Sequence, residues 1–221
     1  MRSTVLASEG LRDSRSRAPK VPMAGALKAR KQPRQRRSRA LVAAIIEGAA
    51  RVFDREGFAA TTNRIASEAG VSIGSLYQYF PNKESLLLAL AERHLEQGQR
   101  QLEAAVARAR EAEEVEALFR CFVEAIVDAH RRHPRMHQVL EEVSPRTPEL
   151  IARARELKRI MQRELAAQLR RLRPELDQVE RKAALLTSAI PAAIHDDIGE
   201  RRDAAMVDEL VALCIRYLGE P

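Results

Sequence analysis

The sequence predicts an all-α protein, and three observations lead to this prediction. Aromatic residues make up only 4% of the chain and Trp is absent, while Ala, Leu, Arg and Glu are abundant, a composition that favours helices over sheets. From Leu41 onwards, apolar residues recur at steps of three and four positions, as they do along amphipathic helices. Nowhere do apolar and polar residues alternate between hairpin turns, as strands would require.

Residues 1–37 are expected to form a disordered basic arm. This segment lacks helical periodicity and contains Pro19, Pro22 and Pro33. Up to Arg39 the chain has 12 Lys and Arg residues and two acidic residues, a net charge of +10, whereas the remaining 26 basic and 29 acidic residues sum to −3. The pI of 9.9 is therefore a property of the arm. Two alternatives stay open for it, a solvated tail or a segment that follows DNA.

Four helices are predicted in the region that follows. The first carries an apolar stripe from Leu41 and ends at Gly57. A short second helix, capped by Thr61 or Thr62, stops at Gly70. Ser72 is positioned to cap a third helix, and Asn82 a fourth.

The remaining chain is also predicted to be helical, with clear start and stop signals. Thr147 before Pro148 is typical of a helix start, and Pro174, Gly199 and Gly219 mark ends. Pro191 falls inside one segment and should kink or break it. The expected segments are Val115–Arg132, Pro134–Glu142, Pro148–Leu172, Leu176–Ile198 and Ala204–Leu218.

The second and third helices have the spacing of a helix-turn-helix. Gly70-Val71-Ser72 supplies the short turn, and Gly70 suits its left-handed position. The outer face of the third helix carries groups suited to DNA, with small or hydroxyl-bearing residues at its N-terminus. The predicted DNA-facing residues are Ser72 and Ser75 through their hydroxyls, Gly74 through close backbone approach, Tyr77 and Tyr79 at phosphate height, and Lys83 through its charge.

The segment from about Ala40 to Leu90 resembles the N-terminal domain of the tetracycline-repressor (TetR) family. The resemblance rests on Phe53, Gly57-Phe58, Ile65-Ala66, Ala69-Gly70-Val71-Ser72, Gly74, Leu76-Tyr77, Tyr79-Phe80, Asn82-Lys83-Glu84 and Leu86. It implies a three-helix DNA-binding head at residues 38–95, followed by a helical effector-binding and dimerisation domain at 96–221. By the same resemblance, Thr62 and Asn63 would touch the DNA backbone, and Ile73 would face the bases.

Two further sets of residues are assigned to the C-terminal domain. Wide apolar stripes in the last two helices predict pairing across a dyad. A pocket among the middle helices is implied by the resemblance, although apolar residues at helical spacing are also typical of ordinary core. The pocket residues are Phe119, Phe122, Ile126, Met136, Leu157 and Met161, and the dimer residues are Leu186, Ala189, Ala193, Met206, Leu210, Leu213 and Tyr217.

Other kinds of site are not predicted. His130, His133 and His137 suggest a metal site, but Pro134 interrupts the helix between them and no Cys or carboxylate pair joins at ligand spacing. We therefore expect no metal and no cofactor. Catalytic motifs are also absent, so no enzyme is predicted. With two scattered cysteines, no secretory signal and no long apolar run, a cytoplasmic location is expected.

The predicted function is that of a homodimeric regulator of transcription that binds a palindromic operator in double-stranded DNA. It is expected to act as a repressor that a small-molecule effector releases, with no membrane partner. Two alternatives stay open: a nucleoid-type DNA-binding protein without an effector, and a small helical enzyme.

Overall fold

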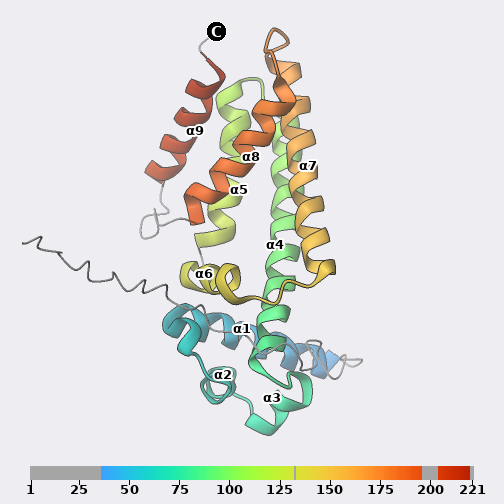
Figure 1. Ribbon diagram of the computed structural model, residues 1–221, viewed down its shortest axis with the longest axis vertical. Coiled ribbons are helices and arrows are strands. Elements are labelled where there is room, and N and C mark those ends of the chain that lie inside the picture. The colour runs from blue at the N-terminus through green and yellow to red at the C-terminus, as the bar shows by residue number, and fades with distance from the viewer. Residues whose placement is uncertain (1–35, 132, 196–203, 220–221) are drawn as a thin grey trace, which may run out of the picture.

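The computed structural model describes residues 36–131, 133–195 and 204–219, and it is helical throughout (Figure 1). Within those ranges the chain forms nine α-helices and one short 3-10 helix, with no strands. The predicted all-α class is therefore confirmed. None of the described helices is long and apolar enough to span a membrane.

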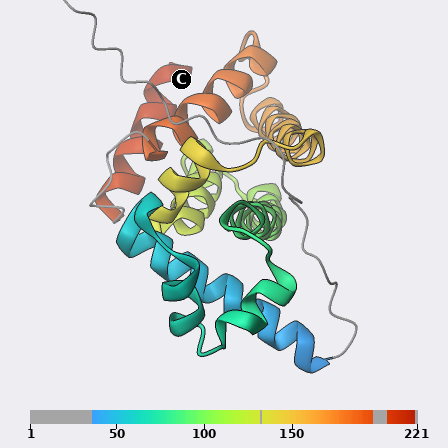
Figure 2. The ribbon, with the colours of Figure 1, turned by 60° about the horizontal axis from the view of Figure 1, so that its bottom comes forward.

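The helix-turn-helix lies at one end of the molecule, in a small head. The head consists of α1 (Arg36–Glu56), η1 (Gly57–Ala59), α2 (Thr62–Glu68) and α3 (Ile73–Tyr79), packed against the first turns of α4 (Lys83–Glu111). In Figure 2, which brings this end forward, α2 and α3 lie on the side of α1 that faces away from the other helices. The core of the head is apolar and fully buried around Ile45, Phe53, Ile65, Leu76 and Phe80.

The remaining helices form a larger body. They are α5 (Val115–Arg131), α6 (Pro134–Val143), α7 (Pro148–Leu172), α8 (Val179–His195) and α9 (Ala204–Leu218). Helix α4 belongs to both parts, because its 29 residues extend about 43 Å at the usual rise per residue. Within the body, helix α6 lies next to the head, beside α1 (Figure 1).

Side-chain caps determine where the helices of the head begin. The Thr61 side chain accepts a hydrogen bond from the backbone N–H of Arg64, which decides between the two candidate threonines. Ser72 caps α3, and Asn82 caps α4 in a reciprocal arrangement with Ser85. Each cap satisfies backbone donors that a helix start leaves without a partner.

Two differences from the predicted helices occur in α8. This helix begins at Val179 rather than Leu176, because the chain first turns through Gln178, whose φ of 53° is left-handed. Pro191 does not end the helix, which continues to His195. The last residues expected for this helix, beyond His195, lie outside the described ranges.

The predicted basic arm lies almost entirely outside the described residues. Helix α1 begins at Arg36, so Arg36, Arg37 and Arg39 belong to the head. The positive charge counted up to Arg39 is therefore shared between the arm and the first helix. Both cysteines are free thiols, and burial raises the pKa of Cys214 to about 11, which keeps this thiol protonated and unreactive.

Candidate nucleic-acid interface and ligand cavity

Helices α2 and α3 are held together by a tight turn and a small core. Gly70 has a φ of 66°, and the backbone N–H of Val71 donates to the carbonyl of Ala66 at 3.0 Å. Ile65 and Leu76 are fully buried between the helices. The turn and the core together fix the angle at which α3 is presented to the outside.

The first turns of α2 and α3 form an exposed face of small and hydroxyl-bearing side chains. Ile73 and Tyr77 are 37% and 42% exposed, and Gly74 is exposed between them. The Tyr77 hydroxyl lies 3.0 Å from the Thr62 hydroxyl, which links the two helices across this face. Asn63 is exposed beside Thr62.

The two serines of this face already have partners within the protein. The Ser72 hydroxyl accepts from the backbone N–H of Ser75 at 3.0 Å and lies 2.8 Å from the Ser75 hydroxyl. A hydroxyl has one donor and two acceptor positions. Each serine therefore keeps capacity for a further hydrogen bond while it caps the helix.

Tyr79 and Lys83 lie differently from the other predicted DNA-facing residues. Tyr79 is only 8% exposed and belongs to the core of the head. The Lys83 ammonium donates to the carbonyls of Phe58 at 2.6 Å and Ala60 at 3.1 Å, and it lies 4.0 Å from the centre of the Phe58 ring. Burial lowers the pKa of Lys83. Both side chains thus help to hold the head together, and their contact with phosphate stays a prediction.

The other described cations from Arg51 to Arg93 form ion pairs within the head. Arg55 lies 2.6 Å from Glu68, Arg64 lies 3.0 Å from Glu56, and Arg93 lies 2.8 Å from Glu47. Arg51 lies 3.6 Å from both Glu47 and Glu68. The α2–α3 face therefore offers hydroxyls, backbone amides and the positive end of the α3 dipole rather than unpaired charge.

A cavity of about 610 Å³ lies among α4, α5, α6, α7 and α8. Four of the six predicted pocket residues line it, namely Phe122, Ile126, Leu157 and Met161. The other two lie in packed core: Phe119 is 2% exposed among the body helices, and Met136 packs with the core of the head. The volume falls in the range of small-molecule sites.

The surface of the cavity wall is mainly apolar, and most of its formal charge is positive. Arg146, Arg155 and Lys158 line it together with one carboxylate, that of Glu141. The side-chain oxygens of Gln101 and Ser144 are buried at this wall with no hydrogen-bond partner. A bound molecule with polar groups can satisfy both oxygens, whose burial is otherwise unfavourable.

Two family models match the chain, and together they cover both parts of the structure. Residues 45–90 match the model of "Bacterial regulatory proteins, tetR family", and residues 115–218 match the model "Tetracyclin repressor-like, C-terminal domain". The chain belongs to the TetR family. The resemblance seen in the sequence of the head is thereby confirmed and extended to the body.

Relatives and solved structures agree with this assignment. A 52-residue segment is 48% identical to the uncharacterized HTH-type transcriptional regulator YerO of Bacillus subtilis, and the match spans 23% of this chain and 18% of that protein. A TetR-family regulator from Mesorhizobium loti superposes with a TM-score of 0.63 at 18% identity, over 83% of this chain and 97% of the other. A TetR-like regulator from a Rhodococcus species gives 0.60 at 23% identity, over 86% and 100%.

Helix α6 of this TetR-family chain contacts the cavity on one side and the head on the other. His137 and Leu140 line the cavity. Met136 and Val139 pack into the core of the head, and Leu140 contacts this core as well. The α6 N-terminus starts at Pro134 without a side-chain cap of its own. Asp54 of α1 supplies that cap, because its Oδ1 accepts from the backbone N–H groups of Arg135 at 3.0 Å and Met136 at 3.2 Å. This contact has no signature in the sequence, because its partners are 81 and 82 positions apart.

Replacing Asp54 by alanine is expected to lower the free energy of unfolding by about 1 kcal/mol, the usual cost of losing a helix cap. Asp54→Asn should lower it less, because the amide keeps an oxygen acceptor at the same place. Urea unfolding followed by circular dichroism measures both. Equal losses in the two variants would show that the hydrogen bonds to α6 do not stabilise the fold.

The predicted dimer residues separate into two groups. Leu186, Met206 and Leu210 are at most 7% exposed and pack inside the body of one chain. Leu213 and Tyr217 on α9 are 54% and 42% exposed, and Ala189 on α8 is also exposed. Ala193 is half-buried. Leu185, which belongs to the same apolar stripe of α8, is 52% exposed.

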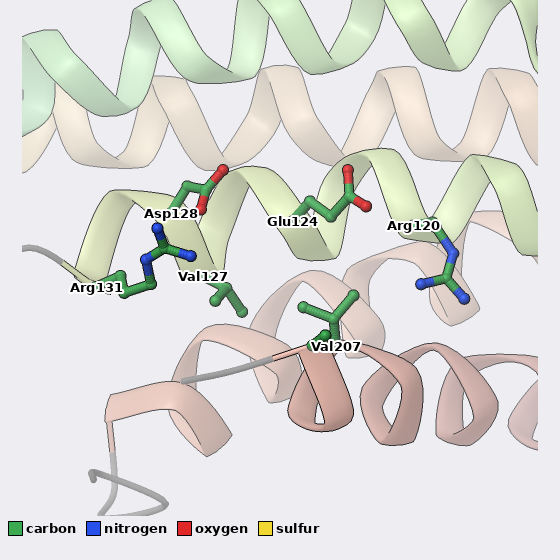
Figure 3. A pocket seen from close by; sticks show the side chains of 7 residues that line it. Arg120, Glu124, Val127, Asp128, Arg131 and Val207 are labelled. Atoms are coloured by element: carbon green, nitrogen blue, oxygen red, sulfur yellow. The ribbon is translucent and has the colours of Figure 1, made fainter. Parts of the chain in front are cut away.

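A second, smaller space of about 280 Å³ lies between α5 and α9. Figure 3 shows the charged side chains of α5 along it, with Val127 and Val207 from the two helices beside them. Arg120 donates to Asp208 of α9 at 2.7 Å, so an ion pair bridges the two helices. Four of the seven residues that line this space are charged, so the larger cavity is the better site for an apolar ligand.

Proposed function

We propose that this chain is a homodimeric, sequence-specific DNA-binding regulator of transcription, a repressor that a small molecule releases from its operator. The exposed face of α2 and α3 carries the proposal. Its small residues, Ser72, Gly74 and Ser75, allow the first turn of α3 to approach base edges closely, and Thr62, Asn63 and Tyr77 flank it with groups that can bind phosphate. Ile73 would contact a thymine methyl group.

The exposed apolar side chains of α8 and α9 support the homodimer. Leu185, Leu213 and Tyr217 project from two helices of the body, away from the core that Leu186 and Leu210 form with α5. Two copies that join these faces around a dyad bury the side chains in a four-helix bundle. Their recognition helices would then reach two half-sites about one DNA turn, ~34 Å, apart.

The position of α6 supports release by an effector. Any molecule that fills the 610 Å³ cavity touches α6 at His137 and Leu140, and α6 holds α1 through Asp54. A ligand that binds better when α6 is displaced shifts the population toward dimers whose heads no longer match the operator spacing. Because the wall is mostly apolar with three cations, we propose an effector with an apolar body and an anionic or acceptor group.

The test is a gel shift with the full chain and the DNA upstream of its own gene, at physiological salt. A discrete band that unlabelled specific DNA removes, and random DNA does not, is expected. A smear of retarded DNA with every sequence tested, whose intensity depends steeply on salt, would instead indicate nucleoid-type binding. Absence of any retarded band would overturn DNA binding at this operator.

Release is tested separately by screening small molecules for binding to the free protein. A ligand that occupies the cavity should raise the melting temperature, because it binds the folded state alone. The same ligand should then remove the operator band at the concentration that saturates the protein. A saturating cavity ligand that leaves the band unchanged would contradict release through this site.

A further inference from the structure

Three histidines from three different helices meet at the cavity wall. His94 comes from the middle of α4, His130 from the last turn of α5 and His137 from the first turns of α6. One ring nitrogen of each lies within 4.8 Å of those of the other two. The ring centres are 4.4 to 5.3 Å apart.

We propose that His94, His130 and His137 bind one divalent transition-metal ion, of which Zn²⁺ is the representative. In this arrangement three imidazoles supply the protein ligands, and the fourth position is open to the cavity. Sites with three protein ligands and one open position accept water or a donor group of another molecule. Neutral imidazole nitrogen suits Zn²⁺, Ni²⁺, Co²⁺ and Cu²⁺, whereas Mg²⁺ and Ca²⁺ require oxygen ligands.

The backbone prepares at least one of the rings for this role. His130 Nδ1 lies 2.7 Å from the carbonyl oxygen of Ile126. Because a carbonyl only accepts, Nδ1 carries the proton in this hydrogen bond, and in the neutral ring Nε2 is the nitrogen with the lone pair that binds a metal. Metal-binding histidines usually donate their other ring N–H in this way, since the hydrogen bond fixes both tautomer and orientation.

Burial and spacing also fit a shared cation. His130 and His137 are only 6% and 4% exposed, and His94 is half-buried beside them. Three imidazole rings at this spacing can share one ion. Zn–N bonds of about 2.0–2.1 Å put tetrahedral nitrogens about 3.3 Å apart. Side-chain rotations that move the ring nitrogens by roughly an ångström therefore bring them to the distances that Zn²⁺ requires.

His133 is not part of the cluster, although it lies closer in sequence to His130 and His137 than His94 does. Its Nε2 is directed to the head, 3.7 Å from the Glu47 carboxylate. Pro134 interrupts the helical pattern, which is one reason for expecting no metal site from the sequence. In the structure Pro134 is the first residue of α6, the helix that brings His137 to the other two rings. The missing third ligand was His94, 36 residues before His130.

The site would tie α4, α5 and α6 together where the body meets the head. Since α6 contacts α1, we expect the ion to fix the position of the head and therefore to change operator affinity. This regulatory part rests on the proposed function, while metal binding itself does not. An anionic group on the effector would be a suitable fourth ligand.

The test uses the full, untagged chain, from which a chelator has first removed bound metal. The chain is then dialysed against Zn²⁺ or Co²⁺, and the bound metal per chain is measured. One equivalent per chain is expected, and bound Co²⁺ should give the intense visible absorption of a four-coordinate nitrogen site. His94→Gln and His137→Gln should each weaken binding at least roughly 10-fold. His133→Gln is the matched control and should bind as the unchanged chain does.

Less than half an equivalent in the unchanged chain would overturn the proposal, whatever the variants do. It would also be overturned if His133→Gln weakened binding as much as His94→Gln. Gel shifts with and without Zn²⁺ separate the two proposals. If the chain gives an operator band but binds no metal, the metal site is contradicted and the proposed function is not. If it binds metal but gives no operator band, the proposed function is contradicted and the metal site is not.

Discussion

Replacing Gly74 by leucine is expected to lower affinity for operator DNA by roughly 100-fold or more without weakening the fold. Each lost or distorted base contact costs about 1–3 kcal/mol, and a side chain at this position separates the whole first turn of α3 from the groove. Within the protein the new side chain has room. The nearest atom to a Cβ at Gly74 is the Ser72 hydroxyl oxygen, 3.9 Å away, and the backbone angle is not left-handed.

Gel shifts and urea unfolding on the same preparation measure the two effects. Free energy of unfolding should stay equal or rise by up to about 1 kcal/mol, because glycine is a poor helix former. Ala107→Leu, at an exposed position of α4 far from the head, is the matched control and should bind DNA normally. Unchanged operator affinity in Gly74→Leu would place the DNA interface elsewhere.

Substitution by alanine is expected to change the free energy of unfolding in opposite directions at two glycines that lie within helices. A Cβ at Gly48 of α1 would lie 3.0 Å from both the backbone nitrogen and the Cβ of Ala69, where α1 crosses α2. At Gly98 of α4, the nearest atom would be Leu157 Cδ2 at an ordinary 3.6 Å. The same substitution therefore meets backbone in one place and a flexible side chain in the other.

We expect Gly48→Ala to lower the free energy of unfolding by about 1–2 kcal/mol, since the cost of overpacking exceeds the gain in helix propensity. Gly98→Ala should raise it by up to about 1 kcal/mol. Urea unfolding of both variants checks the contrast. A shift of the same sign and size in the two would mean that α1 and α2 are not closely packed at Gly48.

Local features of the sequence were sufficient to predict the helices and the helix-turn-helix. Caps such as Ser72 and Asn82 act on donors three residues away, and the turn at Gly70 depends on its own backbone angle. Such signals are visible in a short window of residues. The short α2 and α3 helices were found for this reason, together with their relative order.

Contacts between distant segments were not visible in the sequence. The apolar stripes of α8 and α9 were wide enough to indicate more than one contact, but not which residues face inward. Leu186 packs inside the chain, while Leu185, one position before it, is exposed. Leu210 is also buried, while Leu213, three positions after it, is exposed. In the same way, Phe119 packs in the core although Phe122 lines the cavity. Side-chain direction in a helix changes by about 100° per residue, so these assignments need the neighbouring helices.

The same limit explains Lys83 and the histidine cluster. A lysine at a helix start is typical of a phosphate contact, yet its ammonium binds the carbonyls of Phe58 and Ala60, which only the folded head brings within reach. His94, His130 and His137 come together because α4, α5 and α6 meet at the cavity. Neither arrangement has a signature in sequence spacing.

A dimer of this chain is expected to read a specific duplex through α3, and selection from random DNA measures this specificity. The full chain is incubated with a library of random duplexes at physiological salt, and bound DNA is recovered, amplified and sequenced over several rounds. We predict enrichment of one palindrome with half-site centres about 10 base pairs apart, and no enrichment with Gly74→Leu. Recovery of DNA without any shared motif, or of the same motif with Gly74→Leu, would contradict sequence-specific reading through α3.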